Sequence, residues 1–390
     1  MRCVPLLLVA FALAVAGCAT APPTPIAGKD TLFHDALFAP PSKPVRAADV
    51  FALSDAMKHY LDVVIAPQVL EKGRQRALFD ALYSANQLKL DYDAAITRTA
   101  SEAFASRSGN CLSLTIMTAA LAKELGLDAH FQRVESEDAW TRTGEIYFAS
   151  SHVNVILGRR SADPRVHDNE KSLLTIDFIP PKDTALYRTF PISDETVIAM
   201  FMNNRAAETL AEGKLDDAYW WARSAIGQDP SFLSAYNTLA VVYKVHGNLH
   251  EAEALLRVLL AREPANLNAM TNLALVLEDE GRGAEAEALS DRIDRLQPHP
   301  PFYFFNRGKE AFERGDYAQA KKLFGRELER DPTYHEFHFW FAAACLKLGE
   351  RELAREHLMA ARENSNTRAE EAIYKAKLDR LNGATTILAH

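Results

Sequence analysis

The stretch YNTLAVVYKVHGNLHEAEALLRVLLAREP, from Tyr236 to Pro264, decides the fold of the second half of the chain. Apolar residues recur at helical spacing on both sides of Gly247, and Ala252 supplies a small side chain where two helices would cross. Glycine lets the chain turn between two helices, and proline cannot continue the second one. The stretch therefore predicts one helix–turn–helix unit that ends at Pro264.

The same signature returns every 34 residues. The recurring positions are Gly213, Gly247, Gly281, Gly315 and Gly349; Ala218, Ala252, Ala286, Ala320 and Ala354; Pro230, Pro264, Pro298 and Pro332; and, at the small site of the first helix, Ala206, Ala240, Ala274, Gly308 and Ala342. A unit of two helices with this period resembles the tetratricopeptide repeat. We predict five repeats over residues 199–368, followed by a capping helix and tail over residues 369–390.

This resemblance implies an all-α solenoid with a concave groove, because one repeat cannot bury its own apolar face. Such grooves bind protein or peptide ligands. Phe302, Phe305 and Phe339 of the aromatic fourth and fifth repeats occupy positions that would face the groove. We expect them to line a partner site, and the alternative is that these rings pack between helices.

A second informative segment is RSGNCLSLT, residues 107–115. Gly109 and Asn110 indicate a turn, and the apolar spacing that follows indicates a helix, so Cys111 falls in its first turn. A thiol attacks only as a thiolate, which the unpaired amides of a helix start and a nearby imidazole both favour. Cys111 is therefore a candidate nucleophile.

Two later segments offer partners for this thiol. SHVNVIL (151–157) and LLTIDFI (173–179) are typical of strands and carry His152 and Asp177. A base and an orienting carboxylate thus follow the nucleophile in chain order. Asn154 shares a strand face with His152 and is the alternative for the third position.

The order of Gly109, Cys111, His152 and Asp177 resembles the transglutaminase-like superfamily of cysteine enzymes, over residues 90 to 180. The resemblance implies a papain-type α+β domain, assigned to residues 46–195, with Cys111 as nucleophile and no cofactor or metal. It implies acyl transfer or hydrolysis at a peptide or isopeptide amide. Arylamine acetyltransferases share the superfold, so the reaction type stays open. The alternatives are protein crosslinking and a catalytically silent scaffold of the cell envelope.

The chain begins with Met1-Arg2, an apolar run from Val4 to Ala16 and the sequence VAGC ending at Cys18. The run is too short for an ordinary membrane span. VAGC resembles a bacterial lipobox, which implies a signal peptide over residues 1–17, a lipid on Cys18 and anchoring to a membrane. Residues 18–45 are rich in proline and predict a tether. Alanine after Cys18 favours the outer membrane, facing the periplasm, by resemblance.

Composition narrows the remaining classes of function. Cys3 and Cys18 belong to the signal and lipid site, which leaves two free thiols, Cys111 and Cys345, and no disulfide framework. Cys345 occupies a helical repeat position and is expected to be a packing residue. The formal net charge of -8, without a basic stripe, argues against nucleic-acid binding.

Overall fold

The structure is a computed structural model that describes residues 29–83, 88, 90–94, 96–143, 146–158, 173–178, 188–299, 302–365 and 368–387. The predicted signal peptide, Cys18 and the first part of the tether lie outside these residues. Within them, no helix combines the length and apolar character that crossing a bilayer requires.

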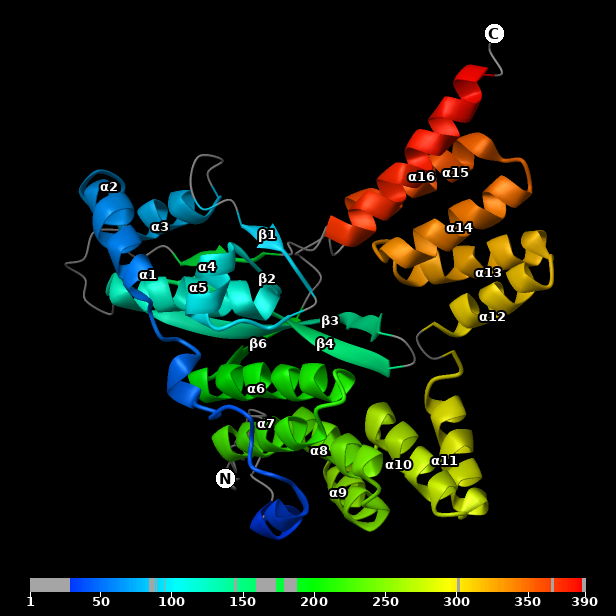
Figure 1. The fold of residues 1–390 in the computed structure, drawn as a ribbon, viewed down its shortest axis with the longest axis horizontal. Helices are drawn as coiled ribbons and strands as arrows, with labels where there is room; N and C mark the ends of the chain where they lie inside the picture. The colour runs from blue at the N-terminus through cyan, green and yellow to red at the C-terminus, as the bar shows by residue number, and fades with distance from the viewer. Residues whose placement is uncertain are drawn as a thin grey trace, which may run out of the picture.

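An α+β unit forms the first half of the described chain (Figure 1). Its short 3₁₀ turns are η1 (Lys29–Leu32), η2 (Asp35–Leu37) and η3 (Ala47–Asp49). Its longer helices are α1 (Asp55–Tyr60), which continues through the π-helical segment η4 (Leu61–Ile65) into α2 (Ala66–Lys72), and α3 (Arg74–Tyr83), α4 (Ala100–Ser106) and α5 (Cys111–Glu124). Its strands are β1 (Asp91–Tyr92), β2 (Ser108–Gly109), β3 (Ala129–Thr143), β4 (Ile146–Leu157), β5 (Leu174–Ile176) and β6 (Arg188–Ile192).

The sheet has the order β5-β4-β3-β6, and every neighbouring pair is antiparallel. Helix α5 packs against β4, and the Thr115 hydroxyl donates to the backbone carbonyl of Val153 at 3.3 Å. Every residue of α5 from Leu112 to Ala122 is buried, because the sheet covers one side and α3, α4 and the first repeat helix cover others. This central helix holds its first turn, with Cys111, beside the sheet.

In the described part of the second half, the chain forms eleven helices. They are α6 (Asp194–Ala211), α7 (Leu215–Gln228), α8 (Leu233–His246), α9 (Leu249–Arg262), α10 (Leu267–Asp279), α11 (Gly283–Leu296), α12 (Tyr303–Glu313), α13 (Tyr317–Arg330), α14 (His335–Lys347), α15 (Arg351–Glu363) and α16 (Arg368–Ile387). The first ten form five antiparallel pairs, and the recurring glycine between the helices of each pair has a positive φ of 76° to 90°. The helix pairs follow the 34-residue period of the sequence, and α16 covers most of the segment for which a capping helix is predicted.

The repeats form two stacks rather than one continuous solenoid. Helices α6–α11 share a hydrophobic core with the α+β unit, whereas α12–α16 have cores of their own. Figure 1 shows α12–α16 as a separate group of helices. In the described chain, successive repeats pack closely at α7–α8, α9–α10 and α13–α14, but not at α11–α12. The connecting sequence contains Pro298, Pro300 and Pro301, and α12 begins only at Tyr303. Proline cannot extend a helix and disfavours helical backbone before it, which explains the interruption.

The predicted tether over residues 18–45 is wrong for its described part. Residues from Leu32 to Ser42 lie against α7 and α8 and contain the short turn η2. The ring of Phe38 is buried, and several backbone groups of the segment form hydrogen bonds to repeat side chains. A proline-rich composition predicted flexibility, but one buried aromatic and these polar contacts order the segment instead.

Candidate functional site

The loop before α5 is fixed by a network around Asn110. Its side-chain oxygen accepts from the Ser113 N–H at 2.9 Å and from the Ser113 hydroxyl at 2.7 Å. Its amide donates to the Thr97 hydroxyl at 2.8 Å. Asn110 is thus the N-cap that the start of α5 needs. A Cβ at Gly109 would lie 2.7 Å from Cβ of Ser113, so this close turn requires glycine.

The first repeat helix supports the same loop. On α6, the Asn204 amide donates to the Thr97 hydroxyl at 3.2 Å, and Glu208 accepts from the Thr97 backbone N–H at 2.7 Å. Burial raises the pKa of Glu208 although the bonds from Thr97 and Arg205 oppose that shift. The cap of α5 is therefore tied to the repeat region through buried polar contacts.

His152 and Asp177 meet at one edge of the sheet. Strand β4 carries His152, and Asp177 directly follows β5, which pairs with β4 through Val155 and Ile176. The His152 Nε2 lies 2.7 Å from Oδ1 of Asp177. The second carboxylate oxygen accepts from the Asn154 amide at 3.2 Å. Asn154 therefore contacts Asp177 rather than replacing it beside the imidazole.

Cys111 completes the cluster. Its side chain is half-buried and hydrogen-bonds that of His152, so the structure brings all three predicted residues together. Burial lowers the pKa of His152, but the hydrogen bonds and negative charges of Asp177 and Cys111 outweigh it and raise the pKa to about 9. At neutral pH this imidazole is mostly protonated and can give its proton to a group that departs beside it. The arrangement can activate a nucleophilic sulfur.

Cys345 is the contrasting thiol. It is fully buried on α14, and burial raises its pKa to about 12. A buried thiol of this kind is a small packing group with little reactivity. The expected packing role of Cys345 agrees with this position.

The sequence did not single out Tyr92, which lies next to the cluster. Strand β1 pairs with β2 in parallel and sets Tyr92 opposite Gly109, two residues before Cys111. The backbone of Cys111 hydrogen-bonds the Tyr92 hydroxyl, while burial and the nearby Cys111 charge raise the pKa of that hydroxyl. Tyr92 therefore keeps its proton and can donate it to a developing oxyanion. The only sequence signal for a role of Tyr92 would have been the pairing of strand β1 with β2, which brings it near Cys111.

The predicted aromatic partner site is wrong for two of its three residues. Phe302 and Phe305 are 2 % and 0 % exposed and form the core of the second stack with Phe337. Phe302 has a φ of 63°, and its ring packs edge-on against that of Tyr334, with 5.2 Å between the centroids. Phe339 is half-buried, and the ring of Tyr374 on α16 lies 5.5 Å from it. These rings stabilise the stack rather than face an open groove.

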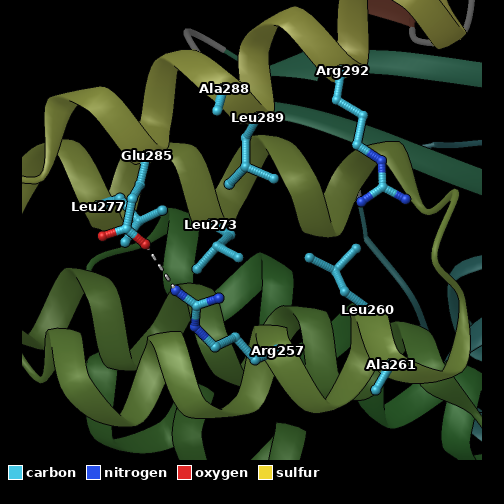
Figure 2. A pocket seen from close by; sticks show the side chains of 9 residues that line it. All are labelled: Arg257, Leu260, Ala261, Leu273, Leu277, Glu285, Ala288, Leu289 and Arg292. Atoms are coloured by element: carbon cyan, nitrogen blue, oxygen red, sulfur yellow. Dashed lines mark hydrogen bonds and ion pairs between the residues drawn. The ribbon is translucent and has the colours of Figure 1, made fainter.

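A pocket of about 440 Å³ lies in the first stack instead, between α9, α10 and α11 (Figure 2). Its apolar lining comes from four leucines, Leu260, Leu273, Leu277 and Leu289. Arg257 and Arg292 stand at its sides, and Arg257 pairs with Glu285 at 3.4 Å. The sequence pattern did not predict this pocket, since the leucines occupy ordinary repeat positions.

Family models described as tetratricopeptide repeat match residues 237–300 and 311–378. The C-terminal half of the chain thus contains tetratricopeptide repeats. The chain is similar to YrrB, a tetratricopeptide protein with an unusual peptide-binding site (21% identity, 46% of this chain, 92% of that chain, TM-score 0.25). It is also similar to pilF of Pseudomonas aeruginosa (22% identity, 50% and 88% covered, TM-score 0.30) and to a thermophilic tetratricopeptide protein of Thermus thermophilus (19%, 46% and 98%, TM-score 0.29). No curated protein matches the chain.

Proposed function

We propose that the repeats bind a protein partner and that this interaction is the chain's principal function. The matched repeat segments carry the proposal, because stacked helix pairs of this family present surfaces for proteins or extended peptides. The pocket between α9 and α11 supports it, since its leucine lining suits an apolar side chain of a partner. The matches favour an interaction role more directly than an enzymatic one.

Photo-crosslinking in intact cells tests this proposal. A photoreactive residue replaces Leu289, which lines the pocket, and in a control it replaces Glu287, which is exposed on the same helix. We expect a discrete protein adduct from position 289 that position 287 does not give. Adducts of equal yield from both positions, or none from either, would contradict a partner in this pocket.

Acyl transfer at Cys111 is a second candidate function, favoured by the 2.7 Å contact between His152 and Asp177 beside the thiol. The Cys111 thiolate would attack an amide carbonyl carbon, and the His152 imidazolium would protonate the departing amine. His152 would then take a proton from water or an acceptor amine, which attacks the thioester and frees the thiolate. Asp177 would hold the imidazole in place. The resemblance of the sequence to transglutaminase-like enzymes is a further argument for this second candidate function.

The repeats would then recruit the protein whose amide reaches Cys111. If the chain is a catalytically silent scaffold, Cys111 has no substrate and its thiol should not be activated. An acyl probe selective for activated thiols separates the two, because adduct mapping by mass spectrometry identifies the labelled residue. We expect the adduct at Cys111, and labelling only after unfolding would support the scaffold.

The VAGC motif supports a further part of the proposal, that the mature chain is a lipoprotein of the outer membrane facing the periplasm. Intact mass measurement of the membrane fraction should give a lipid increment on Cys18. The Cys18→Ala variant should lose that increment. A mature chain that begins at another residue would contradict the assignment.

A further inference from the structure

The segment from Leu32 to Ser42, here called the N-terminal clasp, contacts α7 and the end of α8 in the first two repeats (Figure 1). Phe38 is its one buried side chain, and the others are half-buried or exposed. A strand or helix of the core would bury a whole face. A single anchor in an otherwise exposed segment is typical of a bound peptide.

The anchor ring fits between aromatic side chains of the repeats. Phe38 stacks on Tyr219 with ring centroids 3.9 Å apart and an angle of 7° between the ring planes. Its centroid lies 4.5 Å from that of His246 and 5.9 Å from that of Tyr243. Offset stacking and burial of one ring give a recognition pocket for an aromatic residue.

A carboxylate provides the second specific contact. Oδ1 of Asp35 accepts from the Tyr219 hydroxyl at 2.6 Å and from Nε of Arg223 at 2.7 Å. Burial raises the pKa of Asp35, but these two hydrogen bonds outweigh it and lower the pKa. The guanidinium of Arg223 also lies 4.9 Å from the ring centroid of Phe33. The surface thus selects an acidic residue three positions before the buried phenylalanine.

The remaining contacts are hydrogen bonds between side chains of the repeats and the backbone of the clasp. The Tyr243 hydroxyl donates to the carbonyl of Leu32 at 2.9 Å and accepts from the N–H of His34 at 3.1 Å. Trp220 Nε1 donates to the Ala39 carbonyl at 2.7 Å. Asp216 accepts from the Ala39 N–H at 2.8 Å, and Asp217 from the Ser42 N–H at 2.7 Å. Backbone contacts supply affinity for any peptide of this shape, so Asp35 and Phe38 supply the specificity.

The recognition surface does not recur along the array. The residues that follow Tyr219 at the 34-residue period are Glu253, Glu287, Lys321 and Arg355, and none of them is aromatic. The residue one period after Trp220 is Ala254. The surface is therefore a feature of the first repeat pair rather than a consequence of the repeat fold.

We propose that this surface on α7 and α8 is a peptide-recognition site, and that the N-terminal clasp is its displaceable ligand within the same chain. The site accepts a peptide with an acidic residue three positions before a phenylalanine. This deepens the proposed partner-binding function by naming the chemistry of one partner. This peptide site involves neither the pocket between α9 and α11 nor the Cys111 thiol. An experiment that contradicts the peptide site therefore leaves the proposals for the pocket and the thiol untouched.

Displacement of the clasp changes the reach of the chain. From Cys18 to Leu32 the chain can span about 50 Å at full extension, and from Cys18 to Arg46 about 100 Å. If Cys18 carries the membrane anchor, a competing peptide both occupies the first repeats and roughly doubles the distance that the body can move from the bilayer.

Fluorescence anisotropy with a labelled peptide of residues 30–44 tests the proposal. The receptors are the full chain and its Asp35→Ala/Phe38→Ala variant, in which the clasp loses both anchors. The wild-type site is occupied by a ligand at millimolar effective concentration, so we expect the variant to bind the peptide roughly 100-fold more tightly. A peptide carrying the same two changes should not bind, and adding Arg223→Gln to the variant should weaken binding at least tenfold.

Two outcomes overturn the proposal. One is a double variant that keeps the wild-type helical signal but does not bind the labelled peptide. The other is a double variant that unfolds, because removing the anchors of a ligand leaves its receptor folded. Hydrogen exchange of the wild-type chain gives an independent check. The clasp amides of His34, Ala39 and Ser42 should exchange well before those of α7, and exchange only on global unfolding would make the clasp part of the core.

Discussion

The repeats and the α+β unit build their surfaces in different ways. Within each of the two stacks of repeats, a helix pair packs against the next pair in sequence, so the periodic glycines and alanines specify both helices and packing. In the α+β unit, the candidate site joins a helix start, the middle of β4 and the residue after β5. Local pattern therefore determines the repeat fold, whereas the thiol site depends on how distant segments pair.

This difference predicts different responses to substitution. A change in the thiol cluster should alter chemistry and leave the helices folded. A change at a repeat crossing should lower stability and leave the chemistry intact.

The largest expected effect is that of His152→Ala on the thiol. Without the imidazole, Cys111 loses the base beside it, and its alkylation by iodoacetamide at pH 6 should slow by roughly 100-fold. Mass spectrometry of the labelled peptides gives the rate, with buried Cys345 as the internal reference. An unchanged Cys111 rate in a folded variant would make Cys111 a packing residue.

Tyr92→Phe removes only the hydroxyl beside the Cys111 backbone. If that hydroxyl donates to an oxyanion, turnover of a thioester or activated-amide probe should fall by about 100-fold. Alkylation, which forms no oxyanion, should change much less. Equal losses in both assays would show instead that Tyr92 positions the sulfur.

A substitution where two repeat helices cross should change the free energy of unfolding and leave the reactivity of Cys111 unchanged. In α12, a Cβ at Gly308 would lie 2.6 Å from Phe324 of α13, so Gly308→Ala should destabilise the second stack by about 2 kcal/mol. The matched control is Gly227→Ala in α7, where a new Cβ meets no atom within 4 Å and should stabilise by about 0.5–1 kcal/mol. Chemical denaturation followed by circular dichroism measures both. Similar effects from the two changes would contradict the packing at Gly308.

The pH dependence of the α+β unit tests the contact between His152 and Asp177 without a substitution. The pKa of His152 rises from 6.5 when unfolded to about 9 when folded, so its stabilisation is complete below pH 6.5 and is lost as pH passes 9. Unfolding free energy should therefore fall by about 3 kcal/mol between pH 6.5 and pH 9.5. His152→Gln should remove that decrease. A wild-type stability that rises over this range would contradict the ion pair.

The contrast between local pattern in the repeats and long-range pairing in the α+β unit explains which features the sequence could predict. The turns at Gly213 and Gly247 were predictable because they rest on conformations of the local backbone. Phe302 and Phe305 were assigned to a groove because a strict period was assumed, while Pro300 and Pro301 precede a delayed helix.

Long-range partners were harder to predict. His152 and Asp177 could be paired from their chain order and strand patterns, but Tyr92 reaches Cys111 only through the pairing of β1 with β2. Residues 32–42 were assigned to a tether from their composition, although Phe38 contacts Tyr219, far along the chain. Tertiary contacts of this kind leave no local periodic signal.

The central claim is that the repeats bind a partner independently of the thiol. The most direct test is photo-crosslinking from position 289 in cells that carry either the wild-type cysteine or Cys111→Ser. We predict the same protein adduct, in similar yield, from both chains, because the pocket residues belong to α9, α10 and α11 and exclude Cys111. Loss of the adduct in the Cys111→Ser chain would contradict the claim and would make partner binding depend on the chemistry of the α+β unit.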